Sequence, residues 1–447
     1  MNITITPTKL RGTITPPPSK SQAHRLLITA ALTSSGTSVI HSLADSQDIR
    51  ATRRCLSALG ARIDDLESGT VRVRGLGSAI VEAGPAPLLD CGESGSTLRF
   101  LIPVALLVNG KATFTGHGRL MERPLKPYEE VFREKGIAWN QEGGVLTVDG
   151  SRGYGELALA PGEYRLPGNV SSQFFTGLLF VLPLLEGNSA LVSTTALESV
   201  DYINMTRQAQ AAAGVTSRWE PKNTLHIPGG QCYQPFEASV EADWSQAAFW
   251  YAAEGVGNAV TVTGMDEKSI QGDRVILDWG RMIRNEPLSG GVTVPILGQG
   301  GVGRPAASRA RPERPARYAV SLDVSHAPDL VPPAAVWGAL TPGCHLFLKN
   351  AGRLRLKESD RLATVTEVLN ALGADVTEEA DRLLIRGQET LPGGVTVDSH
   401  NDHRIAMMAA IAATRCEKPV TITGAECVNK SYPNFWEDYR KLGGIIQ

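Results

Sequence analysis

The sequence predicts an α/β protein of two or more domains, built from six copies of one unit. Its 447 residues are too many for a single ordinary hydrophobic core. Six segments each begin with a polar cluster, continue as an apolar helical stretch that ends at Gly or Pro, and enter a short β-branched strand. The strands are expected near Val39, Phe114, Leu191, Val262, Phe347 and Ile422. Intervals of 75, 77, 71, 85 and 75 residues separate them, which indicates an internal repeat.

The second half of each unit is predicted to be a polar loop, a second helix and a hairpin. Residues 43–65, 200–219 and 357–379 show this order best. Glycines stand where these helices should end, and a left-handed residue is favoured there. These glycines are Gly60, Gly136, Gly214 and Gly373. The one long interval contains residues 300–317, which are rich in Gly, Pro and Arg and are interpreted as an inserted, disordered surface loop.

The composition narrows the classes of function. Apolar residues make up 42% and charged residues 20%, and the formal net charge is -2, which argues against nucleic acid as the main partner. Six cysteines occur without a CxxC pair and without His at metal spacing, so they are expected to be free thiols in a reducing compartment. We find no signal-peptide pattern and no apolar run of membrane-spanning length. A soluble cytoplasmic protein without a membrane partner is expected.

The helices that open the six units begin at similar polar clusters. These clusters are SKS at Ser19, ESGS at Glu93, VSSQ at Val170, DWSQ at Asp243, SHAPD at Ser325 and NDHR at Asn401. All except the Pro-rich fifth resemble capped helix N-termini, where a Ser, Asp or Asn accepts from free backbone N–H groups. A single cap is usually structural, but several helix starts that converge would form a site for a multiply charged anion.

Basic residues accompany these helix starts and the loops of the same units. Lys20, Ser21 and Arg25 form a compact set of donors, and Arg119 and Arg123 lie four residues apart after a strand. Further candidates are Arg353, Arg355, Lys357 and Arg361 around Glu358 and Asp360, the NDHR cluster at 401–404, and Lys430. Each set has a structural alternative, namely solvated surface cations or, in 353–361, ion pairs along a helix face.

A glycine pattern at 298–303, GQGGVG, matches a dinucleotide-binding fingerprint. The helix that this fingerprint requires is excluded by prolines at 305, 312 and 315, so a nicotinamide dehydrogenase is disfavoured. The sequence also contains no GxxxxGK[ST], HExxH or GxSxG motif. Kinase, zinc hydrolase and serine hydrolase functions therefore lack their usual motifs.

Eight segments in a fixed order resemble the signatures of a known family. SKSQAHR, GESGSTLRF, GRLMERP, NVSSQF, HAPD, LRLKESDRL, NDHRIAM and NKSYP together resemble those of the 5-enolpyruvylshikimate-3-phosphate synthases, which are enolpyruvyl transferases. The resemblance spans nearly the whole chain. It implies a two-lobed inside-out α/β barrel of six βαβαββ repeats, three per domain. Lobe one would comprise residues 1–19 and 239–447, lobe two residues 20–238, with the active site in the cleft between them.

The resemblance also implies a reaction. Members of this family transfer the enolpyruvyl group of phosphoenolpyruvate to the 5-hydroxyl of shikimate 3-phosphate and release phosphate, without a metal or cofactor. Both substrates are polyanions, which agrees with basic loops in a chain of slightly negative net charge. The expected partners are therefore these two small molecules, and a monomer is expected.

Residue by residue, the resemblance implies three sets of site residues. The catalytic set is Asp329, Glu358 and Lys20, with Asp329 taking the hydroxyl proton and Glu358 with Lys20 handling the proton at the methylene carbon. Shikimate 3-phosphate would contact Lys20, Ser21, Arg25, Ser171, Ser172, Gln173, Ser199, Tyr202, Asp329 and Lys357. Phosphoenolpyruvate would contact Lys20, Gly95, Arg123, Gln173, Arg361, Arg404 and Lys430. A metal site is not expected.

Two positions depart from the family pattern, and two other functions stay open. Glu93 and Arg353 stand where family members often carry Asn, so substrate contacts at these positions are not carried over. Gly95 leaves room beside an inhibitor such as glyphosate, although its neighbour Glu93 is unusual. The alternatives are the sister transferase that acts on UDP-N-acetylglucosamine, whose loop usually carries a Cys that GHGRLMERP lacks, and a non-catalytic anion-binding protein of the same fold.

Overall fold

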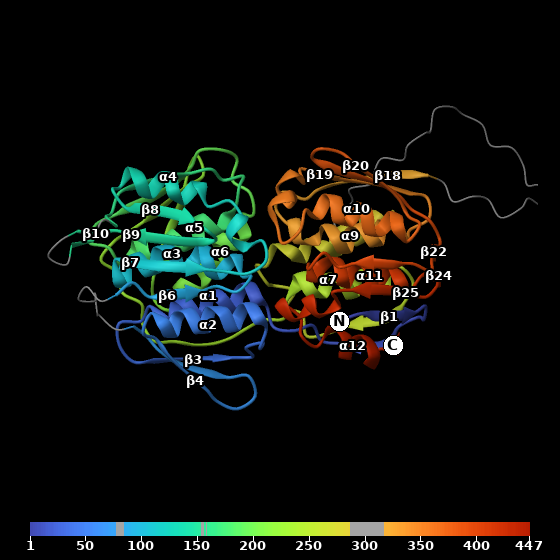
Figure 1. The fold of residues 1–447 in the computed structure, drawn as a ribbon, viewed down its shortest axis with the longest axis horizontal. Coiled ribbons are helices and arrows are strands. Elements are labelled where there is room, and N and C mark those ends of the chain that lie inside the picture. The colour runs from blue at the N-terminus through green and yellow to red at the C-terminus, as the bar shows by residue number, and fades with distance from the viewer. Residues whose placement is uncertain (77–84, 153–155, 158, 287–316) are drawn as a thin grey trace, which may run out of the picture. The chain divides into compact units, whose positions relative to one another are not determined.

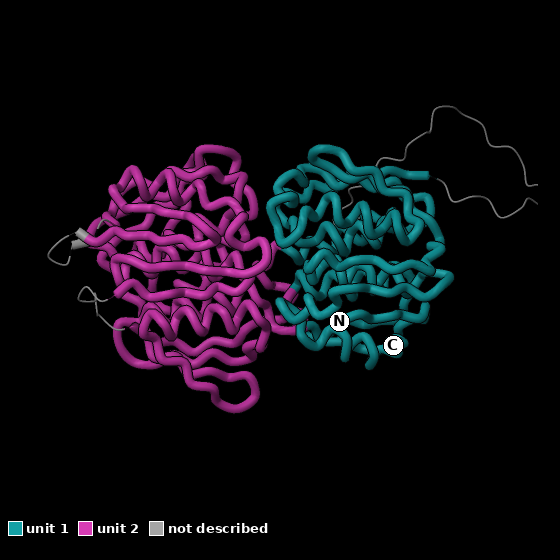
Figure 2. Tube along the Cα trace, in the orientation of Figure 1, with its two compact units in different colours: residues 1–16, 244–264, 273–447 teal, residues 17–243, 265–272 magenta. Residues whose placement is uncertain are grey.

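Two units divide the chain in the computed structural model, which describes residues 1–76, 85–152, 156–157, 159–286 and 317–447 (Figure 1). Unit 1 comprises Met1–Pro16, Trp244–Gly264 and Asp273–Gln447 (Figure 2). Unit 2 comprises Pro17–Asp243 and Met265–Gly272. Each unit contains three of the six predicted strand positions.

The boundaries between the units differ slightly from the expected ones. They lie at 16/17 and 243/244, against 19/20 and 238/239 expected. The second boundary is later because residues 237–239 form a strand that pairs with Val39–His41, which keeps the chain in unit 2. The return of Met265–Gly272 to unit 2 was not expected. In that segment Ser269 Oγ and Gln271 Nε2 donate to the carboxylate of Glu241 over 2.6 and 3.1 Å.

Unit 2 repeats one order of elements three times. The first segment contains α1 (Lys20–Ala31), β3 (Thr37–His41), α2 (Gln47–Ala58), β4 (Arg62–Asp65), β5 (Val71–Arg74) and β6 (Leu88–Asp90). The second contains α3 (Gly95–Asn109), β7 (Lys111–Thr115), η1 (Leu120–Glu122), α4 (Lys126–Glu134), β8 (Ala138–Glu142), β9 (Val145–Asp149), β10 (Ser151–Arg152), β11 (Glu156–Leu157) and β12 (Glu163–Leu166). The third contains α5 (Ser172–Val181), η2 (Leu182–Leu184), β13 (Ser189–Ser193), α6 (Val200–Ala212), β14 (Arg218–Glu220), β15 (Thr224–Ile227) and β16 (Glu237–Ser239).

The sheets of unit 2 follow one another in a cycle. Their strand orders are β16-β3-β5-β4, β6-β7-β9-β8 and β12-β13-β15-β14. In each, the strand that ends one segment runs parallel to the first strand of the next, and an antiparallel hairpin completes the sheet. The last strand, β16, pairs with β3 of the first segment and closes the cycle.

The helices that open the segments form the centre of unit 2. Nearly every residue of α3 and α5 is buried, including the polar residues Thr97, Arg99 and Thr176. The sheets instead alternate buried and exposed residues, as in β5 and β9, which is the pattern of a sheet covered on one face. The apolar helical stretches of the sequence are therefore core helices, and the half-polar strands are the outer layer.

Unit 1 is built from the other three segments and both ends of the chain. The fourth segment contains α7 (Trp244–Gly255), β17 (Ala259–Val262), η3 (Gly272–Val275), α8 (Ile276–Ile283) and β18 (Tyr318–Asp323). The fifth contains η4 (Pro328–Leu330), α9 (Val331–Ala339), β19 (Cys344–Lys349), η5 (Gly352–Leu356), α10 (Arg361–Ala371), β20 (Asp375–Glu378), β21 (Arg382–Arg386), β22 (Leu391–Gly393) and β23 (Thr396–Asp398). The sixth contains α11 (His403–Ala413), β24 (Cys416–Lys418), β25 (Val420–Thr423), η6 (Ala425–Lys430), α12 (Phe435–Lys441) and β26 (Ile445–Ile446), and the chain begins with β1 (Ile3–Thr6) and β2 (Arg11–Ile14).

Strands from both ends of the chain complete the sheets of unit 1. The strand orders are β18-β19-β21-β20, β23-β25-β1-β26, β17-β2 and β22-β24. In the second sheet β1 lies between β25 and β26 and is antiparallel to both. The hairpin expected in the fourth segment, the GQGGVG pattern and residues 300–316 of the inserted loop lie outside the described residues.

Two groups of predictions are confirmed directly. All six predicted strand positions lie in strands, namely β3, β7, β13, β17, β19 and β25. The glycines at 60, 136, 214 and 373 follow helix ends with φ of 107°, 74°, 79° and 101°, where only glycine is unstrained. Among the described helices, none has both the length and the hydrophobicity that crossing a bilayer would require.

Candidate active site

In unit 1, Arg361 is the centre of a buried cluster of charges. It is the first residue of α10, and its side chain is 0% exposed. Its guanidinium donates to Asp402 (Nε to Oδ2, 2.7 Å), to Asp329 (Nη1 to Oδ1, 2.8 Å) and to Glu358 (Nη2 to Oε2, 2.7 Å). Burial would lower the pKa of Arg361, but the three carboxylates raise it above its ordinary value. Arg361 therefore stays charged and fixes two of the predicted catalytic carboxylates, Asp329 and Glu358.

Asp329 is surrounded by cations. Its Oδ2 lies 3.0 Å from Arg404 Nη2, and its Oδ1 lies 3.6 Å from Lys357 Nζ. Burial alone would raise the pKa of Asp329, but the charges of Arg404, Lys357 and Arg361 hold it well below its ordinary value. Burial also lowers the pKa of Lys357 to about 8. The carboxylate is therefore ionised at neutral pH, and a change in the position of the neighbouring cations would change its basicity.

The starts of three helices meet at this cluster. Asp402 caps α11 by accepting from Arg404 N over 3.0 Å, and Arg404 Nη2 donates to Ser245 Oγ, in the first turn of α7, over 2.9 Å. Asp329 lies in η4, which leads directly into α9. Lys430, at the end of η6, donates to the carbonyl of Asn401 over 2.6 Å. The helix starts of three segments therefore converge within unit 1, which the sequence alone did not show.

In unit 2, the start of α1 holds Lys20, Ser21 and Arg25. Lys20 Nζ lies 2.6 Å from Asp48 Oδ2, while its backbone N–H donates to Asp243 over 3.1 Å. Arg25 is buried, and burial lowers its pKa to about 10. Its guanidinium donates to Ser21 O (2.6 Å), Tyr202 O (3.1 Å) and Thr206 Oγ1 (2.9 Å). This predicted group is thus brought together with Tyr202 of α6.

The start of α3 brings together Gly95, Arg123 and Gln173. A Cβ atom at Gly95 would lie only 2.8 Å from Arg123 Nη1, so glycine is required for the close approach of this guanidinium. Gln173 Nε2 donates to Ser96 Oγ over 3.0 Å, and Gln173 Oε1 accepts from Arg99 Nη1 over 2.7 Å. The beginnings of α3 and α5 are therefore adjacent, with a guanidinium and an amide at the start of α3.

The remaining predicted residues also lie at helix starts. Ser171 caps α5 by accepting from Gln173 N, and Ser172 is the first residue of that helix. Ser199 precedes α6 in a left-handed conformation, with φ of 54°. Four of the clusters expected to cap helices contain a capping side chain, namely Ser19, Ser94, Ser171 and Asp402.

Several residues of the clusters were not predicted as site residues. Asp402 was noted only as a member of the NDHR cluster, yet it is the fully buried partner of Arg361. Asp48 and Arg99 were not singled out, although they pair with Lys20 and Gln173. The alternative of ion pairs along a helix face does not describe Arg361, because α10 begins only at this residue. Glu358 lies three residues before Arg361, whereas Asp329 and Asp402 come from other segments, and distant contacts of that kind leave no local signal in a single sequence.

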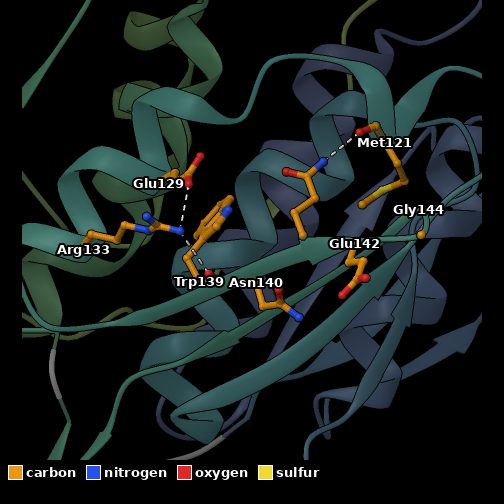
Figure 3. A pocket seen from close by; sticks show the side chains of 9 residues that line it. Met121, Glu129, Arg133, Trp139, Asn140, Glu142 and Gly144 are labelled. Atoms are coloured by element: carbon orange, nitrogen blue, oxygen red, sulfur yellow. Dashed lines mark hydrogen bonds and ion pairs between the residues drawn. The ribbon is translucent and has the colours of Figure 1, made fainter.

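A pocket of about 450 Å³ in unit 2 is a separate feature (Figure 3). It is lined by Met121, Glu129, Arg133, Trp139, Asn140, Gln141, Glu142, Gly143 and Gly144, and by none of the predicted site residues. The guanidinium of Arg133, which lines the pocket, forms an ion pair with Glu129 over 3.0 Å. With three further acidic or amide side chains, Asn140, Gln141 and Glu142, and an arginine that is already paired, this pocket is poorly suited to a polyanion.

A family model described as EPSP synthase (3-phosphoshikimate 1-carboxyvinyltransferase) matches residues 5–439. The chain belongs to the EPSP synthase family. Relatives named 3-phosphoshikimate 1-carboxyvinyltransferase include proteins of Clostridium kluyveri, at 42% identity over 99% of this chain and 98% of the relative, and of Clostridioides difficile, at 39% over 100% and 98%. A solved EPSP synthase structure from Acinetobacter baumannii covers 100% of this chain and 99% of that one, with a TM-score of 0.74 and 24% identity. This likeness confirms the two-domain α/β fold of the EPSP synthase family.

Proposed function

We propose that this protein transfers the enolpyruvyl group of phosphoenolpyruvate to the 5-hydroxyl of shikimate 3-phosphate and releases phosphate. Membership of the EPSP synthase family supports this reaction. The observation that carries it is the buried cluster around Arg361, in which Asp329 and Glu358 accept hydrogen bonds from two different nitrogens of the guanidinium. Two carboxylates held apart by one cation suit a reaction that removes one proton and adds another.

The proposal assigns the two polyanions to cations and helix starts of both units. Phosphoenolpyruvate contacts Lys20, Gly95, Arg123, Gln173, Arg361, Arg404 and Lys430, and shikimate 3-phosphate contacts Lys20, Ser21, Arg25, Ser171, Ser172, Gln173, Ser199, Tyr202, Asp329 and Lys357. What supports this assignment is the clustering of the residues within each unit, together with the positive partial charge of the helix starts at which they lie. Each ligand is thus assigned residues from both units.

Asp329 is the proposed acceptor of the hydroxyl proton. Without substrate, its carboxylate is held by Arg361 and Arg404, and its lowered pKa makes it a weak base. Anionic substrates compete for Arg404 and Lys357, and loss of these contacts leaves only Arg361 to oppose burial, so the pKa of Asp329 rises. Substrate binding therefore activates the base that the reaction needs.

The chemical steps follow from these roles. The 5-oxygen attacks the second carbon of phosphoenolpyruvate as its proton passes to Asp329, and a proton from Glu358 or Lys20 is added to the methylene carbon. The result is a tetrahedral intermediate, whose negative charge the arginines stabilise. When the carbon–oxygen bond to phosphate breaks, a methyl proton returns to Glu358 or Lys20, and the proton held by Asp329 passes to the departing phosphate. The enol ether and phosphate are then released, and all three groups regain their starting protonation.

The deciding experiment is phosphate release from phosphoenolpyruvate by the purified protein in the presence of a metal chelator. We expect release with shikimate 3-phosphate and none with UDP-N-acetylglucosamine. Release only with the nucleotide sugar would assign the protein to the sister transferase. Release with neither acceptor, combined with calorimetric binding of shikimate 3-phosphate, would identify a non-catalytic anion-binding protein.

The proposal also includes a monomeric enzyme of the cytoplasm. Light scattering during gel filtration tests the first point, with the mass of one chain, 47.8 kDa, as the expected result. Cell fractionation of the source organism tests the second. A dimer mass, or recovery in a membrane or secreted fraction, would contradict these expectations.

A further inference from the structure

Four buried side chains form a continuous line of hydrogen bonds through unit 2, outside the residues assigned above. His24 Nδ1 in α1 lies 2.7 Å from Thr52 Oγ1 in α2, and Thr52 Oγ1 lies 2.6 Å from Thr97 Oγ1 in α3. Thr97 Oγ1 donates to Ser94 Oγ, the cap of α3, over 2.7 Å. All four residues are at most 1% exposed. We call this line the His24 relay.

The hydrogen bonds of the His24 relay must all run in one direction, because each hydroxyl has a single proton to donate. Thr97 donates its hydroxyl proton to Ser94, so Thr52 must be the donor in the hydrogen bond between Thr52 and Thr97. The contact between His24 and Thr52 then requires a proton on Nδ1 of His24. The neutral Nδ1–H tautomer of His24 is therefore the one that satisfies every hydroxyl in the line.

The surroundings of His24 support a neutral ring. Burial, followed by the charges of Lys20 and Arg25, lowers the pKa of His24 well below its ordinary value. Its Nε2 is buried and has no hydrogen-bond partner among the described residues, as an unprotonated nitrogen beside apolar groups would. The ring also packs edge-on against Phe100 of α3, at 6.4 Å between centroids.

The two ends of the relay lie next to predicted binding residues. His24 is in the same helix as Lys20 and directly precedes Arg25, and Ser94 directly precedes Gly95, where Arg123 approaches α3. Ser94 Oγ accepts from both the hydroxyl and the backbone N–H of Thr97, so the relay determines the conformation of the first turn of α3. It thereby links the start of α1 to the start of α3.

We propose that His24 is a positioning residue, which as the neutral Nδ1–H tautomer orients Ser94 through Thr52 and Thr97 and so places the first turn of α3 for phosphoenolpyruvate. This inference rests on the proposed function. It assigns to His24, Thr52, Thr97 and Ser94 no direct contact with substrate. Its consequence is that binding of phosphoenolpyruvate depends on a buried threonine of α2, a helix to which none of the substrate contacts was assigned.

Nitrogen-15 NMR of histidine-labelled protein tests the tautomer without an activity assay. The His24 signal is assigned by its absence from His24→Asn, and we expect it to show a protonated Nδ1 and an unprotonated Nε2. In Thr52→Val, which removes the acceptor while keeping the shape, the signal should change. An Nε2–H tautomer or a doubly protonated ring in the wild-type protein would overturn the proposal.

Steady-state kinetics tests the positioning role. Thr52→Val should raise the KM for phosphoenolpyruvate on the order of tenfold, the effect of one lost buried hydrogen bond, and change the KM for shikimate 3-phosphate less. The matched control Thr52→Ser keeps the hydroxyl and should remain close to wild type. His24→Asn, which can supply an N–H near the position of Nδ1, should keep more of the affinity for phosphoenolpyruvate than His24→Phe.

The two proposals fail differently. If wild-type protein releases no phosphate with shikimate 3-phosphate, the proposed function fails, and the NMR result still decides the tautomer. If wild-type protein is active and Thr52→Val has the same KM for phosphoenolpyruvate as Thr52→Ser, the positioning role of the relay is wrong. Circular dichroism of both threonine variants ensures that the comparison is made between folded proteins.

Discussion

Arg361 Nε lies 2.7 Å from Asp402 Oδ2, and both side chains are fully buried. A buried ion pair adds little stability relative to apolar residues, but removal of one partner leaves a charge without compensation. Here the same guanidinium also holds Asp329 and Glu358, so a contact that shapes the core of unit 1 also sets the distance between the proposed base and acid.

Asp402→Asn should destabilise unit 1 because it removes the charge opposite Arg361. We expect the free energy of unfolding to fall by about 3 kcal/mol, the lower end of the range for a broken buried pair, since two carboxylates remain. Urea unfolding followed by tryptophan fluorescence measures this loss. Asp375→Asn is the control, because its pair with Arg386 is about half exposed and should contribute less than about 1 kcal/mol. Equal urea midpoints for the two variants would contradict the prediction.

Gly95→Ala should displace Arg123 because the new Cβ would lie 2.8 Å from Nη1 and 2.9 Å from Cζ of its guanidinium. We expect kcat/KM for phosphoenolpyruvate to fall by about tenfold to a hundredfold, as for a misplaced binding group. Initial-rate kinetics with each substrate varied in turn will show this. The KM for shikimate 3-phosphate serves as the internal comparison, and a parallel rise in both KM values would mean that the methyl group disturbs the whole helix start.

Lys357 should impose an upper pH limit on the use of shikimate 3-phosphate. Burial lowers its pKa to about 8, so the cation is present below this pH and is lost as the pH rises through it. Anion binding requires the protonated form, and kcat/KM for shikimate 3-phosphate should therefore decline above about pH 8. Lys357→Arg should move the decline to higher pH because guanidinium stays charged. An unchanged profile in this variant would assign the limit to another group.

Asp329→Asn should abolish most of the turnover while the protein still binds shikimate 3-phosphate. Loss of a proton acceptor typically reduces the rate by about 10²- to 10⁴-fold. Stopped-flow phosphate release gives kcat, and titration calorimetry gives the affinity. Glu378→Gln is a matched control, since this carboxylate also pairs with an arginine, Arg355, at 2.6 Å, but lies outside the proposed site. Normal turnover in Asp329→Asn would remove Asp329 from the mechanism.

Local features of the fold could be predicted from sequence, because they depend on neighbouring residues. The strand positions follow from β-branched runs, and the helix ends at Gly60 and Gly373 follow from the need for positive φ. The pairing of β1 with β25 and β26 joins residues from opposite ends of the chain, and no local pattern indicates it. The excursion of Met265–Gly272 into unit 2 was missed for the same reason.

In the candidate site, too, local features could be predicted from the sequence, whereas contacts between distant segments could not. Lys20 and Gln173 were predicted as site residues from segments at helix starts. Their hydrogen-bond partners Asp48 and Arg99 were not singled out. Thr52 is a threonine within an ordinary amphipathic helix, and only the structure places it between His24 and Thr97. Residues that act through other residues leave a weak signal in one sequence, because their role depends on distances between segments.

The position of β1 between β25 and β26 also has a consequence for biosynthesis. Apart from Met265–Gly272, unit 2 is one continuous stretch, Pro17–Asp243. Nearly all of its helices and strands have therefore been synthesised while the ribosome is still translating unit 1. Domains generally fold as units during synthesis. Unit 2 should thus fold first, whereas β1 stays unpaired until β25 and β26 have been synthesised. If translation is interrupted before that point, the edges of β1 stay exposed and can pair with other chains, which favours aggregation.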